Sequence, residues 1–308
     1  MIKGPVTDVT GDPTRQGYPV VDVTADATKQ GYPVYVAAGG AYGYPVKVVP
    51  SGGYPVKVTS GSIGFSPLAL APLGWWDVSD TATLWQDTAG ASAVTADGQS
   101  VARIDDKSGA GLHMTQATAS RRPVYRTSGG LHWLEFDGVD DFMSAPAAGA
   151  LTATHEVFVA ANVTAPASGW NGALWSYAAT AANDAASDTE LVIYGDGATK
   201  RFRSRYPGFD NYDTGTNVTA RMGTAAVFWQ GKIGSTDTRQ ATNGGSSTTF
   251  TGASTAVPAT GRYRIGSHTF STQYLACRYY GSAVTPVLSS TDRAKFNTWI
   301  GAKAGLTI

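Results

Sequence analysis

Hydrophobic and polar residues alternate most clearly in the stretch that ends at Asp137. Leu134 and Phe136 fall on one face of an extended chain, whereas Trp133 and Glu135 fall on the other. This is the two-residue period of a strand with one buried side. Asp137 and the glycine after it favour a tight turn, and apolar residues resume beyond it. The pattern predicts an antiparallel hairpin.

Similar short runs, rich in β-branched and aromatic residues, continue over residues 75–308 and are separated by Gly, Asn, Asp and Thr. Many short strands with such turns between them predict an antiparallel sandwich. The runs are 75–78, 83–87, 101–104, 156–161, 174–177, 190–194, 201–206, 225–230, 231–233, 261–266 and 274–280.

One helix is predicted near the C-terminus. Ser290 can cap it, and Phe296, Trp299 and Ile300 form an apolar stripe at helical spacing. Gly305 would end it. The expected fold of residues 75–308 is therefore an all-β antiparallel sandwich with a C-terminal helix.

The first 60 residues contain an internal repeat. Gly-Tyr-Pro-Val occurs at 17–20, 31–34, 43–46 and 53–56, each time followed by a short β-branched run. Proline has no N–H to donate, so it can begin a strand but not continue one. Each copy thus predicts a turn and a short strand. Residues 61–74, rich in Gly, Pro and Ser, are expected to be a linker.

Two interpretations of residues 1–60 compete. They are either a flexible linker or strands that become ordered by pairing with neighbouring subunits or a docking protein. Val-x-Val runs with exposed edges suit strand addition, so we favour an anchoring and oligomerisation region. In this interpretation equivalent tyrosines pack in successive layers of the assembly, namely Tyr18, Tyr32, Tyr44 and Tyr54.

Three motifs in the order Asp-Lys-Ser-Gly at 106–109, Arg-Pro at 122–123 and Leu-x-Phe-Asp-Gly-x-Asp-Asp at 134–141 carry a resemblance. The chain from residue 75 onward resembles the concanavalin A-like, laminin-G-like jelly-roll proteins of tailed phages and gene transfer agents. The Pro-Val repeats are similar to the beginnings of spike and fibre proteins of such particles.

This resemblance implies a jelly roll of two packed antiparallel sheets on a virion surface. The expected protein is a head spike, head fibre or tail fibre that binds host capsular or surface polysaccharide. Its expected partners are further copies of itself in a homo-oligomer and the capsid or tail proteins of the particle. Expected localisation is the virion, after synthesis in the bacterial cytoplasm. Because fold does not fix function, the site needs its own argument.

Charge and composition narrow the partners. The chain has 308 residues with 23 basic and 23 acidic side chains, for a formal net charge of zero. It therefore lacks the basic field of a nucleic-acid-binding protein. No apolar run approaches the length of a membrane span, and no signal peptide is expected. The single cysteine, Cys277, is expected to be a small buried apolar residue rather than a nucleophile.

Glu135 with Asp137 and Asp140 resembles the Glu-x-Asp-x-x-Glu strand motif of β-glucanases that share this fold. In this sequence the third position is the shorter Asp, and Gly138 ends the strand before it. We therefore expect a turn held by aspartates, no catalytic residue and no enzymatic activity. Two alternatives stay open: a glycan depolymerase that uses Glu135, and a purely structural capsid decoration protein.

Metal and cofactor sites are not predicted. The aspartates at 105–106 and at 137, 140 and 141 lack the spacing of known calcium loops, and a turn or solvated face is expected for each. The four histidines, His113, His132, His155 and His268, show no metal-ligand spacing and are expected to be ordinary surface or strand residues.

Glycan-binding residues are expected where aromatic rings, arginines and amide or carboxylate groups gather in loops, since loops at one edge of a sandwich commonly carry recognition. Two stretches have this mixture. The candidate residues are Arg203, Arg205, Tyr206, Phe209, Asp210, Asn211, Tyr212 and, in a second loop, Trp170.

Overall fold

The structure is a computed structural model in which the chain divides into two units, residues 1–64 and 65–308. It describes residues 65–145, 148–149, 151–164, 171–178, 189–196, 198–206, 209–210, 216–234, 236–251, 260–267 and 273–308. The repeats and the proposed assembly residues Tyr18, Tyr32, Tyr44 and Tyr54 lie outside the described residues, so the anchoring role of residues 1–60 stays a prediction.

Eight antiparallel strands form one sheet, in the order β17-β16-β15-β9-β19-β6-β5, with β1 pairing to β19. β19 is central, since it joins β9 to both β6 and β1. The strands are β1 (Gly74–Asp77), β5 (Val124–Ser128), β6 (Leu131–Asp137), β9 (His155–Val163), β15 (Ala225–Lys232), β16 (Asp237–Thr242), β17 (Thr248–Thr251) and β19 (Ala276–Thr285).

Eleven strands form the second sheet, in the order β13-β12-β11-β10-β18-β7-β4-β3-β2, with β14 pairing to β12 and β8 to β18. They are β2 (Leu84–Trp85), β3 (Arg103–Ile104), β4 (Met114–Thr115), β7 (Met143–Ser144), β8 (Ala148–Gly149), β10 (Asn171–Ala178), β11 (Thr189–Asp196), β12 (Thr199–Tyr206), β13 (Phe209–Asp210), β14 (Thr216–Asn217) and β18 (Thr260–Ile265).

The two sheets pack face to face over one apolar core. Its largest fully buried side chains include Trp76, Trp175, Phe136 and Tyr263, contributed by both sheets. Leu134 and Phe136 both point into this core, as their alternation predicts. The predicted all-β antiparallel sandwich is confirmed.

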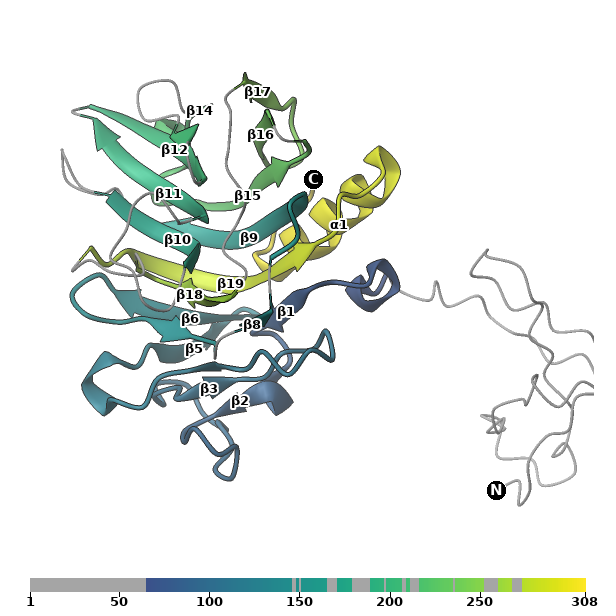
Figure 1. Cartoon of the computed structure of the whole chain (residues 1–308). Helices are drawn as coiled ribbons and strands as arrows, with labels where there is room; N and C mark the ends of the chain where they lie inside the picture. The colour runs from purple at the N-terminus through teal and green to yellow at the C-terminus, as the bar shows by residue number, and fades with distance from the viewer. Residues whose placement is uncertain are drawn as a thin grey trace, which may run out of the picture. The chain divides into compact units, whose positions relative to one another are not determined.

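A second apolar layer lies on the outer side of the eight-stranded sheet, where α1 (Ser290–Lys303) covers it (Figure 1). Phe296 and Ile300 pack against Trp133 and Phe158 there. The predicted helix is confirmed, although its N-cap is Ser289, whose Oγ accepts a hydrogen bond from the Asp292 amide. Among the described residues, no helix has the length and apolar character that crossing a membrane requires.

The predicted hairpin at Asp137 is wrong. β6 pairs with β5 and β19, whereas β7 pairs with β4 and β18 in the opposite sheet. The turn therefore crosses the rim of the sandwich instead of joining neighbours. Phe136 and Met143 are both buried in the same core although they belong to different sheets. The pattern of apolar residues is therefore the same whether the turn joins neighbouring strands or crosses from one sheet to the other.

The sandwich begins earlier than the expected start at residue 75. Phe65 packs edge-on against Phe296 at 5.9 Å and Trp299 at 6.3 Å between ring centroids. The short helix η2 (Pro67–Leu70) follows it. Residues 65–74 thus extend the layer that covers α1. Three more single-turn helices connect strands: η3 (Thr81–Thr83), η4 (Ala119–Arg121) and η5 (Thr219–Arg221).

Candidate functional site

A row of side chains crosses the outer face of the eleven-stranded sheet. The registers join Trp85 to Arg103, Arg103 to Thr115, Thr115 to Ser144 and Ser144 to Arg264. We call these five residues the polar row. Their immediate sequence neighbours Leu84, Ile104, Met114, Met143 and Ile265 fill the core, so the polar row points away from it.

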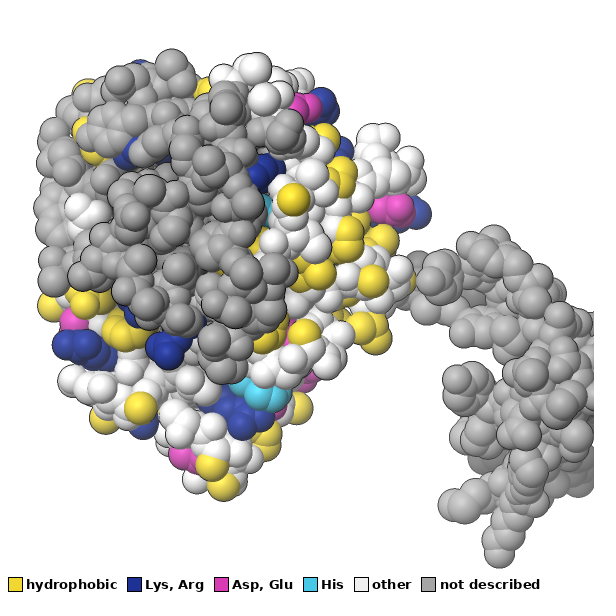
Figure 2. All heavy atoms as spheres, viewed as in Figure 1, with side chains coloured by type: hydrophobic (Ala, Val, Ile, Leu, Met, Phe, Trp, Pro, Cys, Tyr) yellow, Lys and Arg dark blue, Asp and Glu magenta, His cyan; other side chains and the backbone are white. Residues whose placement is uncertain are grey.

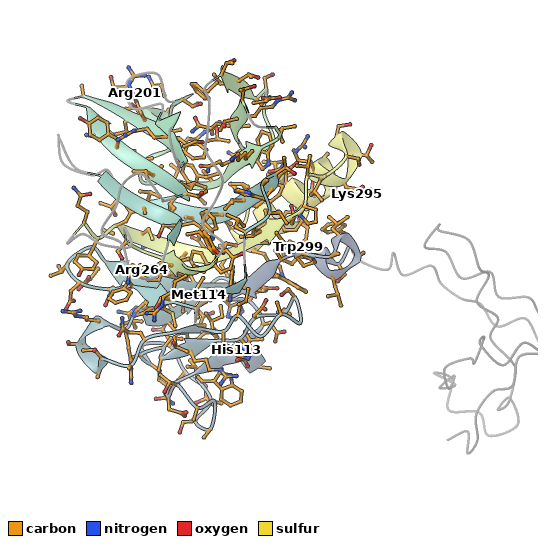
Figure 3. All side chains as sticks on the ribbon, in the orientation of Figure 1. His113, Met114, Arg201, Arg264, Lys295 and Trp299 are labelled. Carbon is orange, nitrogen blue, oxygen red and sulfur yellow. The ribbon has the colours of Figure 1, made fainter. Side chains whose placement is uncertain are left out.

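The backbone register continues the row past Arg264. It runs to Ser176 on β10, then to the positions of Glu190, Arg205 and Asp210. A second arginine follows on β12, where Arg203 lies over the ring of Tyr194 at 5.0 Å. Figure 3 shows Arg201 and Arg264 on the left of the molecule, away from Trp299 and Lys295 on the helix.

One carboxylate organises the β2–β3 end of the polar row. Asp105 accepts hydrogen bonds from Trp85 Nε1 at 2.8 Å and from Arg103 Nε at 2.6 Å. His113 Nδ1 lies 2.9 Å from the same carboxylate. Asp105 thus holds a tryptophan and an arginine beside the histidine, whose Nδ1 accepts a hydrogen bond from the Asp106 amide at 3.2 Å. Support of this kind pre-organises a binding site.

Beside this cluster lies a cavity of about 470 Å³. Its volume is within the usual range for small-molecule sites. The cavity lies over β3, β4, β7 and β18, and Figure 2 shows a histidine next to basic side chains in this region. Its lining residues are Thr88, Arg103, His113, Thr115, Ser144, Ala145 and Arg262.

An aromatic pair lies at the other end of the polar row. Phe142 and Tyr274 stack with ring centroids 6.4 Å apart, and the Arg264 guanidinium lies 4.4 Å from the Phe142 centroid. All three side chains are partly exposed. Rings and a cation therefore lie together at the surface, which is the same mixture of residue types as in the predicted glycan-binding loops.

Five of the predicted glycan residues lie at the β12 end of the same sheet, namely Arg203, Arg205, Tyr206, Phe209 and Asp210. Arg203 is only 4% exposed, so its guanidinium is largely covered. Arg205 pairs in register with Asp210, and Tyr206 with Phe209. Asn211, Tyr212 and Trp170 lie outside the described residues. Their roles in binding stay predictions.

The polar row and its cavity were missed by the sequence analysis. Trp85, Arg103, Thr115, Ser144 and Arg264 are spread over 180 positions and belong to five strands. The signal in the sequence was the polar residue that alternates with a buried apolar residue in each strand. This two-residue period shows which side chains face outward, but it does not show which strand lies next to which.

Glu135 is held in an ion pair. Arg126 Nε donates to Glu135 Oε2 at 2.8 Å, and Asp97 approaches the same guanidinium at 3.5 Å. This pairing raises the pKa of Arg126 above its usual value. Glu135 lies on the helix-covered side of the eight-stranded sheet, next to Trp133. It is therefore far in the fold from the polar row, which belongs to the other sheet.

The Asp137–Asp141 turn gathers three carboxylates, with ligand oxygens of Asp137, Asp140 and Asp141 within 4.8 Å of one another. Asp137 accepts from the Val139 amide, and Asp141 from the Asp137 amide. These bonds confirm a turn held by aspartates. Burial, reinforced by the neighbouring carboxylates, raises the pKa of Asp141 to about 6. Calcium takes six to eight oxygens, more than three side chains supply singly, and the absence of a metal stays a prediction.

Other residues of the motifs that carry the resemblance hold loops in place. Asp106 accepts from the amides of Trp75, Ser108 and Leu112, and Lys107 bonds to Asp80. These contacts tie the 106–112 loop to β1. The motif therefore has a structural role in the described part of the chain.

Two buried titratable groups take no part in the row. Cys277 is free and buried, and burial raises the pKa of its thiol to about 12, as expected for an apolar role. His155 is a strand residue, one of the two settings expected for it, because it begins β9; it is fully buried, and desolvation lowers its pKa to about 4. Its Nδ1 lies 2.9 Å from the Thr152 carbonyl oxygen.

Comparison with known proteins gives matches among solved structures only. No protein-family model matches the chain, and no curated protein matches it. A sialidase of Trypanosoma rangeli aligns with a TM-score of 0.46 and 9% identity, over 74% of this chain and 32% of the sialidase. An arabinofuranosidase solved with arabinofuranosyl-xylobiose gives 0.46 and 16%, over 67% and 51%.

A third similar structure is domain 4 of an extracellular arabinanase from Geobacillus stearothermophilus, solved with arabinotriose. It gives a TM-score of 0.44 and 10% identity, over 63% of this chain and 92% of that domain. The chain thus spans about a third of the sialidase and half of the arabinofuranosidase. Likeness at this level carries no information about the chemistry of this chain.

These neighbours correct one expectation. The sequence analysis predicted no enzymatic activity, but the structures similar to this chain include proteins named as a sialidase and an arabinofuranosidase. The prediction that this chain is not an enzyme is therefore withdrawn. None of the three neighbours described above is named as a phage protein.

Proposed function

We propose that this chain binds a carbohydrate on the outer face of its eleven-stranded sheet. The observation that carries the proposal is the polar row, in which an aromatic ring, two arginines and two hydroxyls follow one another on five adjacent strands. Ring faces stack on the C–H surfaces of sugars, and a few placed polar groups fix orientation. Neighbouring strands lie about 4.8 Å apart, so the row spans about 19 Å, which suits an oligosaccharide.

Binding of the full chain to a panel of bacterial and plant polysaccharides tests this proposal. Arg264→Ala should weaken binding by about tenfold or more, because a charge-assisted hydrogen bond contributes about 1.5–3 kcal/mol. Arg278→Ala is the matched control, since Arg278 lies on β19 in the opposite sheet, 5.1 Å from the Trp133 ring. Equal loss in both variants, or no bound polysaccharide with the wild-type chain, would contradict the proposal.

Hydrolysis of the bound glycan is a second candidate function. It is favoured by the Asp137–Asp140–Asp141 cluster, because a glycosidase needs a carboxyl with a raised pKa near a second carboxylate. Asp141 has a pKa of about 6 and oxygens of both neighbours within 4.8 Å. Phe142, which follows directly in sequence, lies under Arg264 of the polar row.

Release of reducing ends from a bound polysaccharide tests this second candidate. Asp141→Asn should abolish release while binding persists, and Asp237→Asn on β16 should leave release unchanged. Wild-type protein that binds a polysaccharide without releasing any reducing end would rule hydrolysis out. The alternative that Glu135 is the catalytic residue of a depolymerase is tested by Glu135→Gln. That alternative requires that the release of reducing ends be lost in Glu135→Gln instead of in Asp141→Asn.

We infer from the sequence that the protein is a component of a phage-like particle. The support is the motif order at 106–141 and the four Gly-Tyr-Pro-Val repeats. In this proposal the chain forms a homo-oligomer, attaches to capsid or tail proteins through residues 1–60, and presents its sandwich to host polysaccharide. Deletion of residues 1–60 should abolish incorporation into particles while leaving polysaccharide binding intact. Normal incorporation of the truncated chain would contradict it.

A further inference from the structure

The cavity over β3, β4, β7 and β18 has the chemistry of an anion site. We propose that it binds the carboxylate or sulfate group of an acidic sugar. This inference rests on the carbohydrate-binding function proposed above and names the class of its ligand. The cavity shares Arg103, Thr115 and Ser144 with the polar row, so an oligosaccharide bound along the polar row passes over the cavity.

The lining carries positive charge without a facing negative charge. Arg103, Arg262 and His113 line the cavity, and none of its lining residues is acidic. Asp105 supports Arg103 and His113 but is not part of the lining. The one carboxylate therefore balances one guanidinium, and the second arginine leaves the cavity with net positive charge.

Free N–H groups remain on both arginines. Arg103 uses Nε for Asp105 and Nη1 for the carbonyls of Thr88 and Ala89 at 3.4 and 3.3 Å. Among the described residues, its Nη2 makes no hydrogen bond and Arg262 has no hydrogen-bond or ion-pair partner. Guanidinium groups present paired donors that match the two oxygens of a carboxylate or sulfate.

Arg103 is also held in place before any ligand arrives. The carbonyls that it contacts belong to a loop folded around the Asp87 carboxylate, which accepts from the amides of Ala89, Ala91 and Ser92. These amides lower the pKa of Asp87 below its usual value. Because the guanidinium is already ordered, little side-chain entropy is lost on binding.

Two of the three hydroxyl side chains in the lining, those of Thr115 and Ser144, also belong to the polar row. Thr115 Oγ1 donates to the Ser144 carbonyl at 3.3 Å, and both side chains line the cavity together with the arginines. A sugar ring offers hydroxyls next to its acidic group. The combination of two arginines and two hydroxyls therefore fits a uronic-acid-like or sulfated sugar better than an isolated inorganic anion.

Paired oligosaccharides test the inference with the full chain. Each pair contains an acidic oligosaccharide, either a uronic-acid oligomer or a sulfated oligomer, and its carboxyl-reduced or desulfated counterpart. The Kd of the better acidic member should be about tenfold lower than that of its neutral counterpart. Arg262→Gln should remove this preference, and Arg278→Gln on the opposite sheet should retain it.

The outcomes separate the two proposals. Equal binding of acidic and neutral members, or an acidic preference that persists in Arg262→Gln, overturns the acidic-group site while carbohydrate binding stands. Binding of no oligosaccharide and no polysaccharide overturns both. Tighter binding of a single-stranded oligonucleotide than of any acidic sugar, lost in Arg262→Gln, would assign the cavity to phosphate and overturn the inference. Wild-type-like melting of both variants confirms that they are folded.

Discussion

The contact between α1 and the eight-stranded sheet gives the sharpest prediction about stability. Glu156 on β9 is fully buried, and its carboxylate accepts from Arg293 Nε at 2.8 Å, Trp229 Nε1 at 2.8 Å and the Leu288 amide at 2.9 Å. Arg293 Nη2 bonds to it as well. Arg293→Met removes the only cation in this set and leaves a buried carboxylate with two neutral donors.

The expected cost follows from the burial of that charge. Breaking a buried pair by removing one partner costs about 3–5 kcal/mol, because the remaining charge is desolvated without compensation. For a unit of this size each kcal/mol lowers the Tm by about 2–4 °C, so we expect a fall of about 6–20 °C. The double variant Glu156→Gln, Arg293→Met should recover part of the loss, since no charge is left to desolvate.

Chemical and thermal denaturation of the full chain measure this effect. Lys295→Ala is the matched control on the same helix, because Lys295 forms an exposed pair with Asp292 at 3.3 Å and exposed pairs contribute about 0–1 kcal/mol. A loss in Arg293→Met no larger than that in Lys295→Ala would refute the reasoning, as would a double variant less stable than the sum of the two single changes.

Three further predictions follow from single sites. Gly138→Ala should lower the free energy of unfolding by about 1–3 kcal/mol, because φ is +76° and the added Cβ would lie 2.8 Å from the Ala276 backbone nitrogen. Gly109→Ala is the control: φ is +91° there but no atom lies within 4 Å of the added Cβ, so the free energy of unfolding should fall by less. Burial raises the pKa of Asp141 from 3.8 to about 6, so its protonated form favours folding below pH 4, and roughly 3 kcal/mol of this stability is lost as pH rises through 6. The free energy of unfolding of wild type minus that of Asp141→Asn should fall by this amount between pH 4 and 7; taking the difference removes the opposite slope of His155, whose lowered pKa acts equally in both proteins. The Cys277 thiol, with its pKa raised to about 12 and its side chain buried, should react with a thiol reagent only on unfolding, and rapid labelling of the native chain would contradict this.

Individual strands and the C-terminal helix of this protein can be predicted from the local pattern of its sequence. The alternation around Leu134 and Phe136 identified a strand and its buried face, because neighbouring side chains in a strand point to opposite sides. The stripe of Phe296 and Ile300 identified the helix, because its period differs from that of a strand. Together with the turn residues, these local periods were sufficient to predict the sandwich and its closing helix.

The pairing of the strands was decided only in three dimensions. β6 bonds to β19, about 140 residues away, and the turn at Asp137 leads into the opposite sheet. The two-residue period states which face of a strand is buried but not which strand lies beside it. An apolar core forms equally well from a hairpin or from a rim crossing, so the pattern of apolar residues does not distinguish the two and the predicted hairpin is wrong.

The same limit hid the candidate site. Arg103, Thr115, Ser144 and Arg264 lie in separate segments, and each alone has the composition of an ordinary solvent-facing strand position. Only strand register brings them into one row and places Arg262 beside it. A binding site depends on distances between side chains, and in a sheet those distances are set by hydrogen bonds between strands far apart in the chain.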